Sequence, residues 1–143
     1  QWPDLCIGLL TISSQPKTIS STEAMTITKT TSQLYTAWPQ QVKNDLQKIS
    51  HAIQEKNFPL LGATAEHNAL SMHATMLASN PSILYSLPET FNIINKIWQL
   101  RSQGLPLYFT QDAGPNLKLL FLKKEKSLLQ QHFPQLEILN LFE

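Results

Sequence analysis

One aspartate in this sequence stands where a carboxylate could do acid–base chemistry. Asp112 lies in the stretch Tyr108-Phe109-Thr110-Gln111-Asp112-Ala113-Gly114-Pro115-Asn116, in which a β-favouring run gives way to a Gly-Pro turn. A loop held by rigid strands can present such a group to a ligand, and functional residues are common on loops of this kind. The alternative is an aspartate that bonds to the backbone of its own turn, which is frequent at turn positions.

A second segment with chemical potential is rich in hydroxyl groups. Residues 17–32 contain nine serines and threonines but only two basic residues, Lys17 and Lys29. Hydroxyls at this density could donate several hydrogen bonds to an anion. Clusters of Ser and Thr are more typical of solvated loops, however, and we predict a loop here.

The histidines do not form a metal-binding pattern. His67 and His73 are six residues apart, whereas two metal ligands on one helix face require a spacing of four. His73 is either a partly buried, hydrogen-bonded histidine or a functional one, and only its surroundings distinguish the two. The sequence also lacks a Gly-rich phosphate loop, a Walker sequence, CxxC, HExxH and a Gly-x-Ser-x-Gly elbow. We therefore predict no metal site built by this chain alone.

Composition limits the class of protein. The chain has 143 residues, 42% of them hydrophobic and 15% charged, with a formal net charge of +1. These values predict a single globular domain and favour neither a nucleic-acid partner nor a membrane. The only cysteine, Cys6, excludes an internal disulfide and suits the reducing cytoplasm. Because Gln1 is followed almost at once by an apolar run, we expect the chain to be part of a longer protein.

Four short apolar runs predict β-strands. Leu107–Thr110 and Leu117–Leu122 flank the Gly-Pro turn and form a hairpin; the other two strands are expected at Leu5–Ile12 and Leu136–Leu141. All four are predicted to lie in one sheet.

Helical periodicity separates the first strand from the hairpin. A helix from Pro39 should bury the stripe Val42, Leu46, Ile49 and Ile53. A second helix, from about Leu60 to Leu77, carries Asn68 within its apolar stripe, so a buried Asn68 would need a hydrogen-bond partner. A third helix opens at Ser86-Leu87-Pro88-Glu89 and stops at Gly104, and a short one follows the hairpin over Lys123–Phe133. The inward residues predicted for these last two helices are Phe91, Ile94, Ile97, Trp98, Leu128, Leu129 and Phe133.

The order of elements predicts an α+β domain: a mainly antiparallel four-stranded sheet with helices packed on one face.

Several segments together resemble one enzyme family. The order Trp2-Pro3-Asp4, Ile19-Ser20-Ser21-Thr22-Glu23-Ala24-Met25, Asn68 with Met72-His73-Ala74-Thr75, and Phe109 to Asn116 is similar to the C-terminal part of the diphosphomevalonate decarboxylases, members of the GHMP kinase superfamily. The resemblance covers nearly the whole chain. It implies the C-terminal domain of a two-domain enzyme whose N-terminal, ATP-binding domain is absent from this chain.

The resemblance also implies a reaction. The family uses ATP and Mg²⁺, bound mainly through the N-terminal domain, to phosphorylate the tertiary hydroxyl of mevalonate diphosphate. Loss of phosphate and CO₂ then gives isopentenyl diphosphate. The implied protein is a cytoplasmic homodimer, and the implied partners of this chain are the substrate and its own N-terminal domain. The chain alone is expected to be inactive.

Individual roles follow from the same resemblance. Asp112 matches the catalytic aspartate, Ser21 a serine that bonds the diphosphate, and Met25 a residue packed against the substrate. Thr22 lies in the same binding segment, where many bacterial relatives carry an arginine that would hold the diphosphate by a charged fork. His73 and Asn68 match motif positions with supporting roles.

Three alternatives stay open at this point. The first is a decarboxylase that acts on a monophosphate, because the superfamily contains such enzymes. Thr22 in place of an arginine leaves the strength of diphosphate binding open, and Ala24 in place of a usual glycine leaves open whether its turn needs a positive φ. A related GHMP kinase is the second alternative. The third is a non-catalytic binding or assembly module that keeps the fold without the chemistry.

Overall fold

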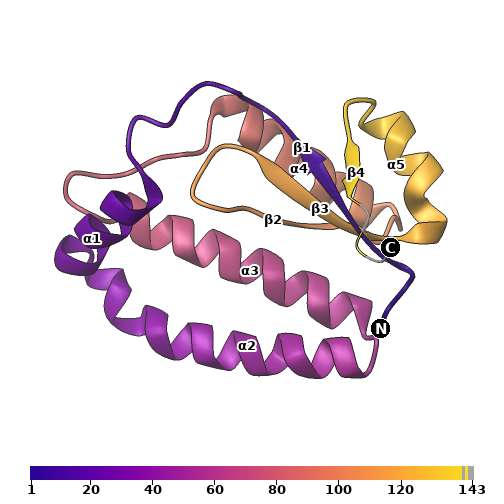
Figure 1. The fold of residues 1–143 in the computed structure, drawn as a ribbon, viewed down its shortest axis with the longest axis horizontal. Helices are drawn as coiled ribbons and strands as arrows, with labels where there is room; N and C mark the ends of the chain where they lie inside the picture. The colour runs from indigo at the N-terminus through magenta and orange to yellow at the C-terminus, as the bar shows by residue number, and fades with distance from the viewer. Residues whose placement is uncertain (140, 142–143) are drawn as a thin grey trace.

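The computed structural model, which describes residues 1–139 and 141, is an α+β domain built on one antiparallel sheet (Figure 1). Its strands lie in the order β2-β3-β1-β4. The elements are β1 (Leu5–Leu10), α1 (Ser21–Thr31), a 3₁₀ turn (Gln33–Ala37), α2 (Trp38–Gln54), α3 (Phe58–Leu77), α4 (Pro88–Ser102), β2 (Tyr108–Thr110), β3 (Leu117–Leu122), a second 3₁₀ turn (Lys123–Glu125), α5 (Lys126–His132) and β4 (Glu137–Leu139). The four predicted strands are confirmed, each within the predicted range. Asn140, inside the predicted Leu136–Leu141, lies outside the described residues.

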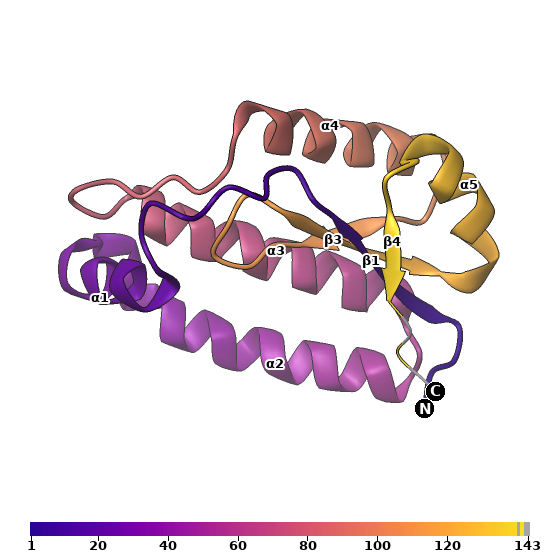
Figure 2. The ribbon, with the colours of Figure 1, turned by 45° about the horizontal axis from the view of Figure 1, so that its top comes forward.

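Helices cover both faces of this sheet, so the prediction of helices on one face was wrong (Figure 2). Leu119 packs with α4 and α5 on one face, while its neighbour Leu120 packs with α2 and α3 on the other. The physical reason is the composition of β3. Leu119-Leu120-Phe121 is apolar at consecutive positions, and because side chains alternate across a strand, both faces must be kept from water.

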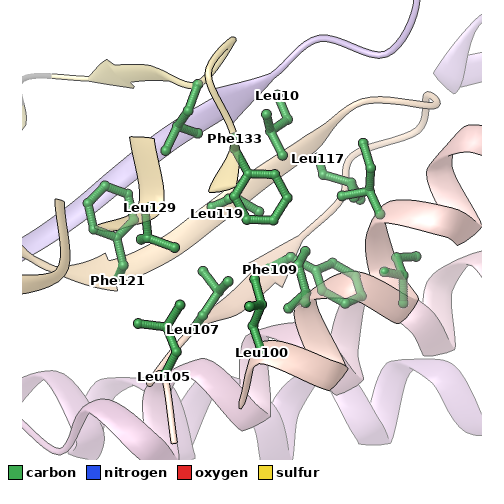
Figure 3. Packing of buried hydrophobic residues seen from close by; sticks show 14 residues of the cluster. Leu10, Leu100, Leu105, Leu107, Phe109, Leu117, Leu119, Phe121, Leu129 and Phe133 are labelled. Atoms are coloured by element: carbon green, nitrogen blue, oxygen red, sulfur yellow. The ribbon is translucent and has the colours of Figure 1, made fainter. Parts of the chain in front are cut away.

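The larger core lies between the sheet and the pair α4 and α5. Phe109, Leu119 and Phe121 of the sheet and Phe133 after α5 are 1% exposed or less, and Figure 3 shows them pointing into one shared space. Burying aromatic and leucine side chains contributes on the order of 2 kcal/mol each to stability. This core fixes the sheet against α4, whose first turn lies next to the hairpin loop.

The hydroxyl-rich segment forms α1, not the predicted loop. Ser20 caps the helix, with its Oγ accepting the Glu23 N–H at 3.2 Å. The Thr28 hydroxyl donates to the carbonyl four residues earlier, at 2.8 Å, and several other threonines of this helix do the same. The helix satisfies these hydroxyls internally, and its fully buried Ala24 ties it to the domain.

The apolar stripe predicted to be buried on α2 is mostly exposed. Leu46 and Ile53 are 63% and 48% exposed and Val42 is 37% exposed, while Ile49 is half-buried. The helix turns its flank with Asp45 and Ala52 toward α3 instead. This flank makes a polar contact, in which Asn68 Nδ2 donates to Asp45 Oδ2 across the helix pair at 3.0 Å, and Ala52 packs in an apolar cluster with Phe58 and Leu61. The expected need of Asn68 for a partner is thus confirmed.

The inward residues predicted on the last two helices are confirmed in part. Ile94, Ile97, Leu129 and Phe133 are buried. Phe91, Trp98 and Leu128 are 48%, 42% and 42% exposed, so their predicted burial was wrong. Gly104 follows the end of α4 and has a φ of 102°, a conformation that favours glycine after a helix.

A buried ion pair joins α3, α4 and β2. Glu66 is 6% exposed and accepts from Trp98 Nε1 at 2.7 Å and from the Arg101 guanidinium at 2.8 and 2.9 Å. Arg101 also donates to the Leu107 carbonyl and stacks over the Tyr108 ring, 4.4 Å from its centroid. These hydrogen bonds to Glu66 raise the pKa of Arg101.

The other side of Tyr108 meets α3 at Gly62. A Cβ atom at this position would overlap the Tyr108 ring, so α3 can approach β2 this closely only because residue 62 is glycine.

We predict that Arg101→Met lowers the free energy of unfolding by about 3 kcal/mol, because the Glu66 carboxylate would stay buried without its cation. Urea denaturation of the chain measures this. The control is Lys124→Met, which removes an exposed ammonium group 3.8 Å from Glu125 and should cost less than about 0.5 kcal/mol. Equal, small losses in both variants would contradict a structural role for the buried pair.

Candidate functional site

The Asp112 carboxylate projects from the loop between β2 and β3. Its side chain is 75% exposed, and Oδ2 accepts from Lys118 Nζ at 2.5 Å. Lys118 lies on β3 opposite Thr110, on the sheet face that α3 covers. Among the described residues, no N–H of its own turn donates to this carboxylate. Asp112 therefore stands at the surface beside a cation and does not cap its turn.

Side chains from the neighbouring segment hold the loop in place. Gln111 is buried, and its Nε2 donates to Gly114 O at 2.8 Å and to Ser86 Oγ at 2.9 Å. Thr90, in the first turn of α4, donates to Pro115 O at 2.9 Å. The loop is thus cross-linked to the segment that leads into α4.

Asn116 ties the other end of the loop to the end of β1. Its Oδ1 accepts the N–H groups of Ile12 and Ser13 at 2.7 and 3.0 Å, and its Nδ2 donates to Ser13 O at 3.2 Å. A side-chain amide here satisfies backbone groups that the sheet leaves unpaired. Both flanks of Asp112 are therefore fixed.

His73 of α3 contacts the same loop from inside. Its Nε2 lies 2.9 Å from Asp112 O, and since a carbonyl only accepts, Nε2 carries the proton. The ring meets the Tyr85 ring edge-on, with the centroids 6.4 Å apart. Burial lowers the pKa of His73, although hydrogen bonds to the backbone of Asp112 and Gln111 oppose this effect. The neutral imidazole is the favoured form in the fold.

An open groove of about 430 Å³ runs along α1. Its lining residues are Ser21, Thr22, Met25, Thr26, Lys29 and Tyr35. Ser20 is the cap of α1, so Ser21 and Thr22 are its first two residues, where backbone N–H groups have no partner within the helix and the helix dipole is positive. Lys29 adds a cation two turns along. The groove offers hydroxyls, N–H groups and one ammonium, a combination that suits an anion.

An apolar cluster connects the groove with the loop. Met25 on the groove side and Ala113 on the loop side both pack against the cluster formed by Ala24, Met76, Ile83 and Tyr85. The fold thus brings Asp112 and His73 together directly. Of the groove residues, Met25 shares this apolar cluster with Ala113, the neighbour of Asp112, while Ser21 and Thr22 lie at the start of the same helix. Asn68 is not part of the arrangement, because it is used between α2 and α3.

Three further residues of this region were not predicted. Lys118 pairs with Asp112, and Tyr85 contacts His73. The Lys17 Nζ lies 3.8 Å from the position that a Cβ on Gly114 would occupy. Lys118 could have been noticed in the sequence, because it is a charged residue inside the apolar run Leu117–Leu122. Its ammonium group must reach the end or the surface of the sheet. Nothing in the sequence pattern indicated Lys17 or Tyr85, whose partners are distant in the chain.

We predict that His73 makes stability depend on pH. Its lowered pKa means that, below the ordinary value of about 6.5, the unfolded chain binds a proton that the folded chain does not. The free energy of unfolding should therefore fall as the pH drops from about 7.5 to about 5.5. His73→Gln should show a smaller fall, since Gln does not titrate.

Chemical denaturation of both proteins at the two pH values tests this. The other three histidines and all carboxylates are present in both, so the difference between the two proteins isolates His73. Parallel pH curves would contradict a lowered pKa of the half-buried His73 imidazole.

Comparisons with known proteins agree on one similarity. Residues 7–139 match the model of the mevalonate 5-diphosphate decarboxylase C-terminal domain. The chain is 31% identical to diphosphomevalonate decarboxylase of Candida albicans over 92% of its own length and 38% of the relative. It superposes on mevalonate pyrophosphate decarboxylase from Streptococcus pyogenes with a TM-score of 0.89 and 30% identity, over 98% of this chain and 46% of that one. For a structure described as MDDEF in complex with MVAPP, AMPPCP and magnesium, the TM-score is 0.86 and the identity 36%, over 96% and 43% of the two chains. The chain thus spans about a third of the length of the curated relatives it matches.

Proposed function

The chain belongs to the mevalonate 5-diphosphate decarboxylase family, as its C-terminal domain, and we propose that it is the substrate-side domain of an ATP-dependent enzyme that converts mevalonate diphosphate to isopentenyl diphosphate. The observation that carries this proposal is the exposed Asp112 carboxylate on a loop held from both sides, in a domain that also has an anion-suited groove along α1. We also propose that the full-length protein contains an N-terminal domain that binds ATP.

Asp112 is the proposed catalytic residue. When the tertiary hydroxyl of the substrate attacks the terminal phosphoryl group of ATP, its proton must leave, and a carboxylate held at the oxygen can orient the O–H and accept that proton. After phosphorylation, Asp112 passes the proton to the departing phosphate and is a carboxylate again. Loss of that phosphate leaves positive charge at the same carbon, which the negative carboxylate stabilises. The electrons of the departing carboxylate group then form the double bond as CO₂ leaves.

Two lysines adjust the charge around Asp112. Lys118 contacts the carboxylate, and Lys17 lies beside Gly114 in the same loop. Reactants with several phosphate groups and a carboxylate would be repelled by an uncompensated aspartate, so nearby ammonium groups favour their approach. Lys17, which also lies 5.9 Å from the Tyr85 ring centroid, stands between the loop and α1, where a phosphate would be within its reach.

The groove of α1 is the proposed site for the substrate diphosphate. Ser21 and Thr22 supply hydroxyl and backbone N–H donors, and Met25 supplies an apolar wall. Thr22 brings no charge, but Lys29 on the same groove does. Among the groove residues it is the one cation, and it supports a diphosphate over a monophosphate as the substrate.

ATP and Mg²⁺ are proposed to bind mainly outside this domain. One solved relative holds AMPPCP and magnesium. In the part of this chain that the structure describes, no group of three or more His, Cys, Asp or Glu residues converges on a common point, and the sequence contains no Gly-rich phosphate loop. These residues do not fit a magnesium site, so no step of the proposal runs through the metal here.

The oligomeric state and the cellular location of the protein stay predictions. The homodimer and the cytoplasmic location follow from the family resemblance, and the free thiol of Cys6 suits a reducing compartment. No helix among the described residues has the length and apolarity needed to cross a bilayer. A related GHMP kinase, a monophosphate decarboxylase and a non-catalytic module are the competing functions, and none is favoured by a specific observation over the proposed one.

We predict that Asp112→Asn in the full-length protein lowers the turnover number by about 10²–10⁴, because the amide keeps the size of the side chain but loses the base. KM for mevalonate diphosphate should change much less, since the groove is untouched. Steady-state kinetics and the melting temperature are measured on the same variant, with Glu55→Gln as a control that removes an exposed carboxylate at the end of α2. Normal turnover with a lowered melting temperature would return Asp112 to a structural role.

We also predict that the 143-residue chain by itself neither binds Mg·ATP tightly nor turns over mevalonate diphosphate. Isothermal titration calorimetry on this chain, with the full-length protein as the positive control, measures the first point. Tight, Mg²⁺-dependent binding to the chain alone would place the nucleotide site within these residues and contradict the proposal.

A further inference from the structure

We propose that Tyr85 and His73 form a positioning pair that couples the groove of α1 to the Asp112 loop. The inference rests on the proposed function, because it concerns how two parts of that site are held at a fixed separation. Neither residue is proposed to touch the reacting atoms. Both act through backbone groups of the segments that do.

Tyr85 fixes the start of α1. The side chain is 8% exposed, and its hydroxyl donates to Ile19 O at 2.9 Å. Ile19 immediately precedes Ser20, the cap of the helix, and Ser21, its first residue. The hydrogen bond therefore holds the backbone at the end of the groove where Ser21 and Thr22 lie, although Tyr85 is more than sixty residues away in the sequence.

His73 fixes the loop on the other side of the same contact. Its Nε2 donates to Asp112 O at 2.9 Å, and its ring packs edge-on against Tyr85 with an interplanar angle of 87°. An edge-to-face aromatic pair has a preferred geometry and resists sliding. One continuous set of contacts thus runs from Ile19 O through Tyr85 and His73 to Asp112 O.

The residue after Tyr85 strengthens this connection. Ser86 Oγ accepts from Gln111 Nε2 at 2.9 Å, and Gln111 immediately precedes Asp112. Two consecutive residues of the segment between α3 and α4 therefore contact the two halves of the site, Tyr85 on the α1 side and Ser86 on the loop side. A shift of this segment would move both halves together, which keeps their separation constant.

A fixed separation matters for the proposed reaction. The substrate would be held by its diphosphate at α1 and would react at its tertiary hydroxyl beside Asp112. Small errors in such a placement are costly, since misplacing reacting groups by about 1 Å can reduce a rate by 10²-fold. The pair supplies the alignment without adding charge at either end.

Tyr85→Phe in the full-length enzyme is the central test. The variant keeps the ring against His73 and loses only the bond to Ile19 O. We expect KM for mevalonate diphosphate to rise about fivefold, the factor that one hydrogen bond of typical net strength represents, while kcat stays within about twofold. The matched control is Ser102→Ala, which also loses one hydroxyl-to-carbonyl bond, to Gln99 O, and should leave both constants unchanged.

The His73 side is tested with two variants. His73→Ala should lower kcat by about 10- to 100-fold with a smaller change in KM, because the loop loses its inner support. His73→Gln keeps an N–H donor and should recover part of kcat. The double variant Tyr85→Phe with His73→Ala should show effects that do not add, as expected for residues in contact that act as a unit.

Hydrogen exchange separates this inference from the proposed function. In Tyr85→Phe, exchange should become faster at the backbone amides of residues 20–22, and in His73→Ala at those of 112–114, whether or not the protein decarboxylates mevalonate diphosphate. An inactive wild-type enzyme with these exchange changes would overturn the function alone. Unchanged KM and unchanged exchange in Tyr85→Phe, or a lowered melting temperature as its only effect, would overturn the positioning pair.

Discussion

The buried carboxylate of Glu66 is the interaction on which the placement of the rest depends. A charged group at 6% exposure is tolerable only if donors surround it, and α4 supplies them through Trp98 and the forked guanidinium of Arg101. Because a planar fork fits a carboxylate in one orientation, α3 and α4 have one relative rotation and height. His73 lies seven residues after Glu66, about two turns along the same face of α3, so the position of its imidazole under the Asp112 loop is set by the same pair.

The elements with simple periodicity could be predicted from the sequence. Short apolar runs located all four strands. Pro39 and Gly104 lie close to the observed start of α2 and the observed end of α4. The orientation of α2 could not be predicted, because hydrophobic periodicity treats Val42, Leu46 and Ile53 as inward. The flank that faces α3 instead carries Asp45, whose partner Asn68 lies on another helix. Likewise, a count of hydroxyls could not reveal that Thr28 and its neighbours bond back into α1.

The residues of the candidate site likewise include some that could be predicted from the sequence and some that could not. The roles of Asp112, Ser21 and Met25 were reached through resemblance, because their spacing alone favoured a turn aspartate and a solvated loop. The contacts that hold them come from residues with no local signature. Tyr85 meets Ile19 and Lys17 meets Gly114 only after the sheet and the segment between α3 and α4 have formed. A pattern confined to neighbouring residues carries no information about such pairs.

Gly62 shows how such long-range dependence would look in a mutational scan. The residue has no side chain and lies far along the helix from the proposed chemistry, yet any Cβ there would displace either the Tyr108 ring or α3 itself. Displacing α3 moves the helix that carries both Glu66 and His73. A survey that scores each position by loss of turnover would therefore rank this glycine beside the residues that handle substrate, and only a simultaneous measure of folded yield would tell the two groups apart.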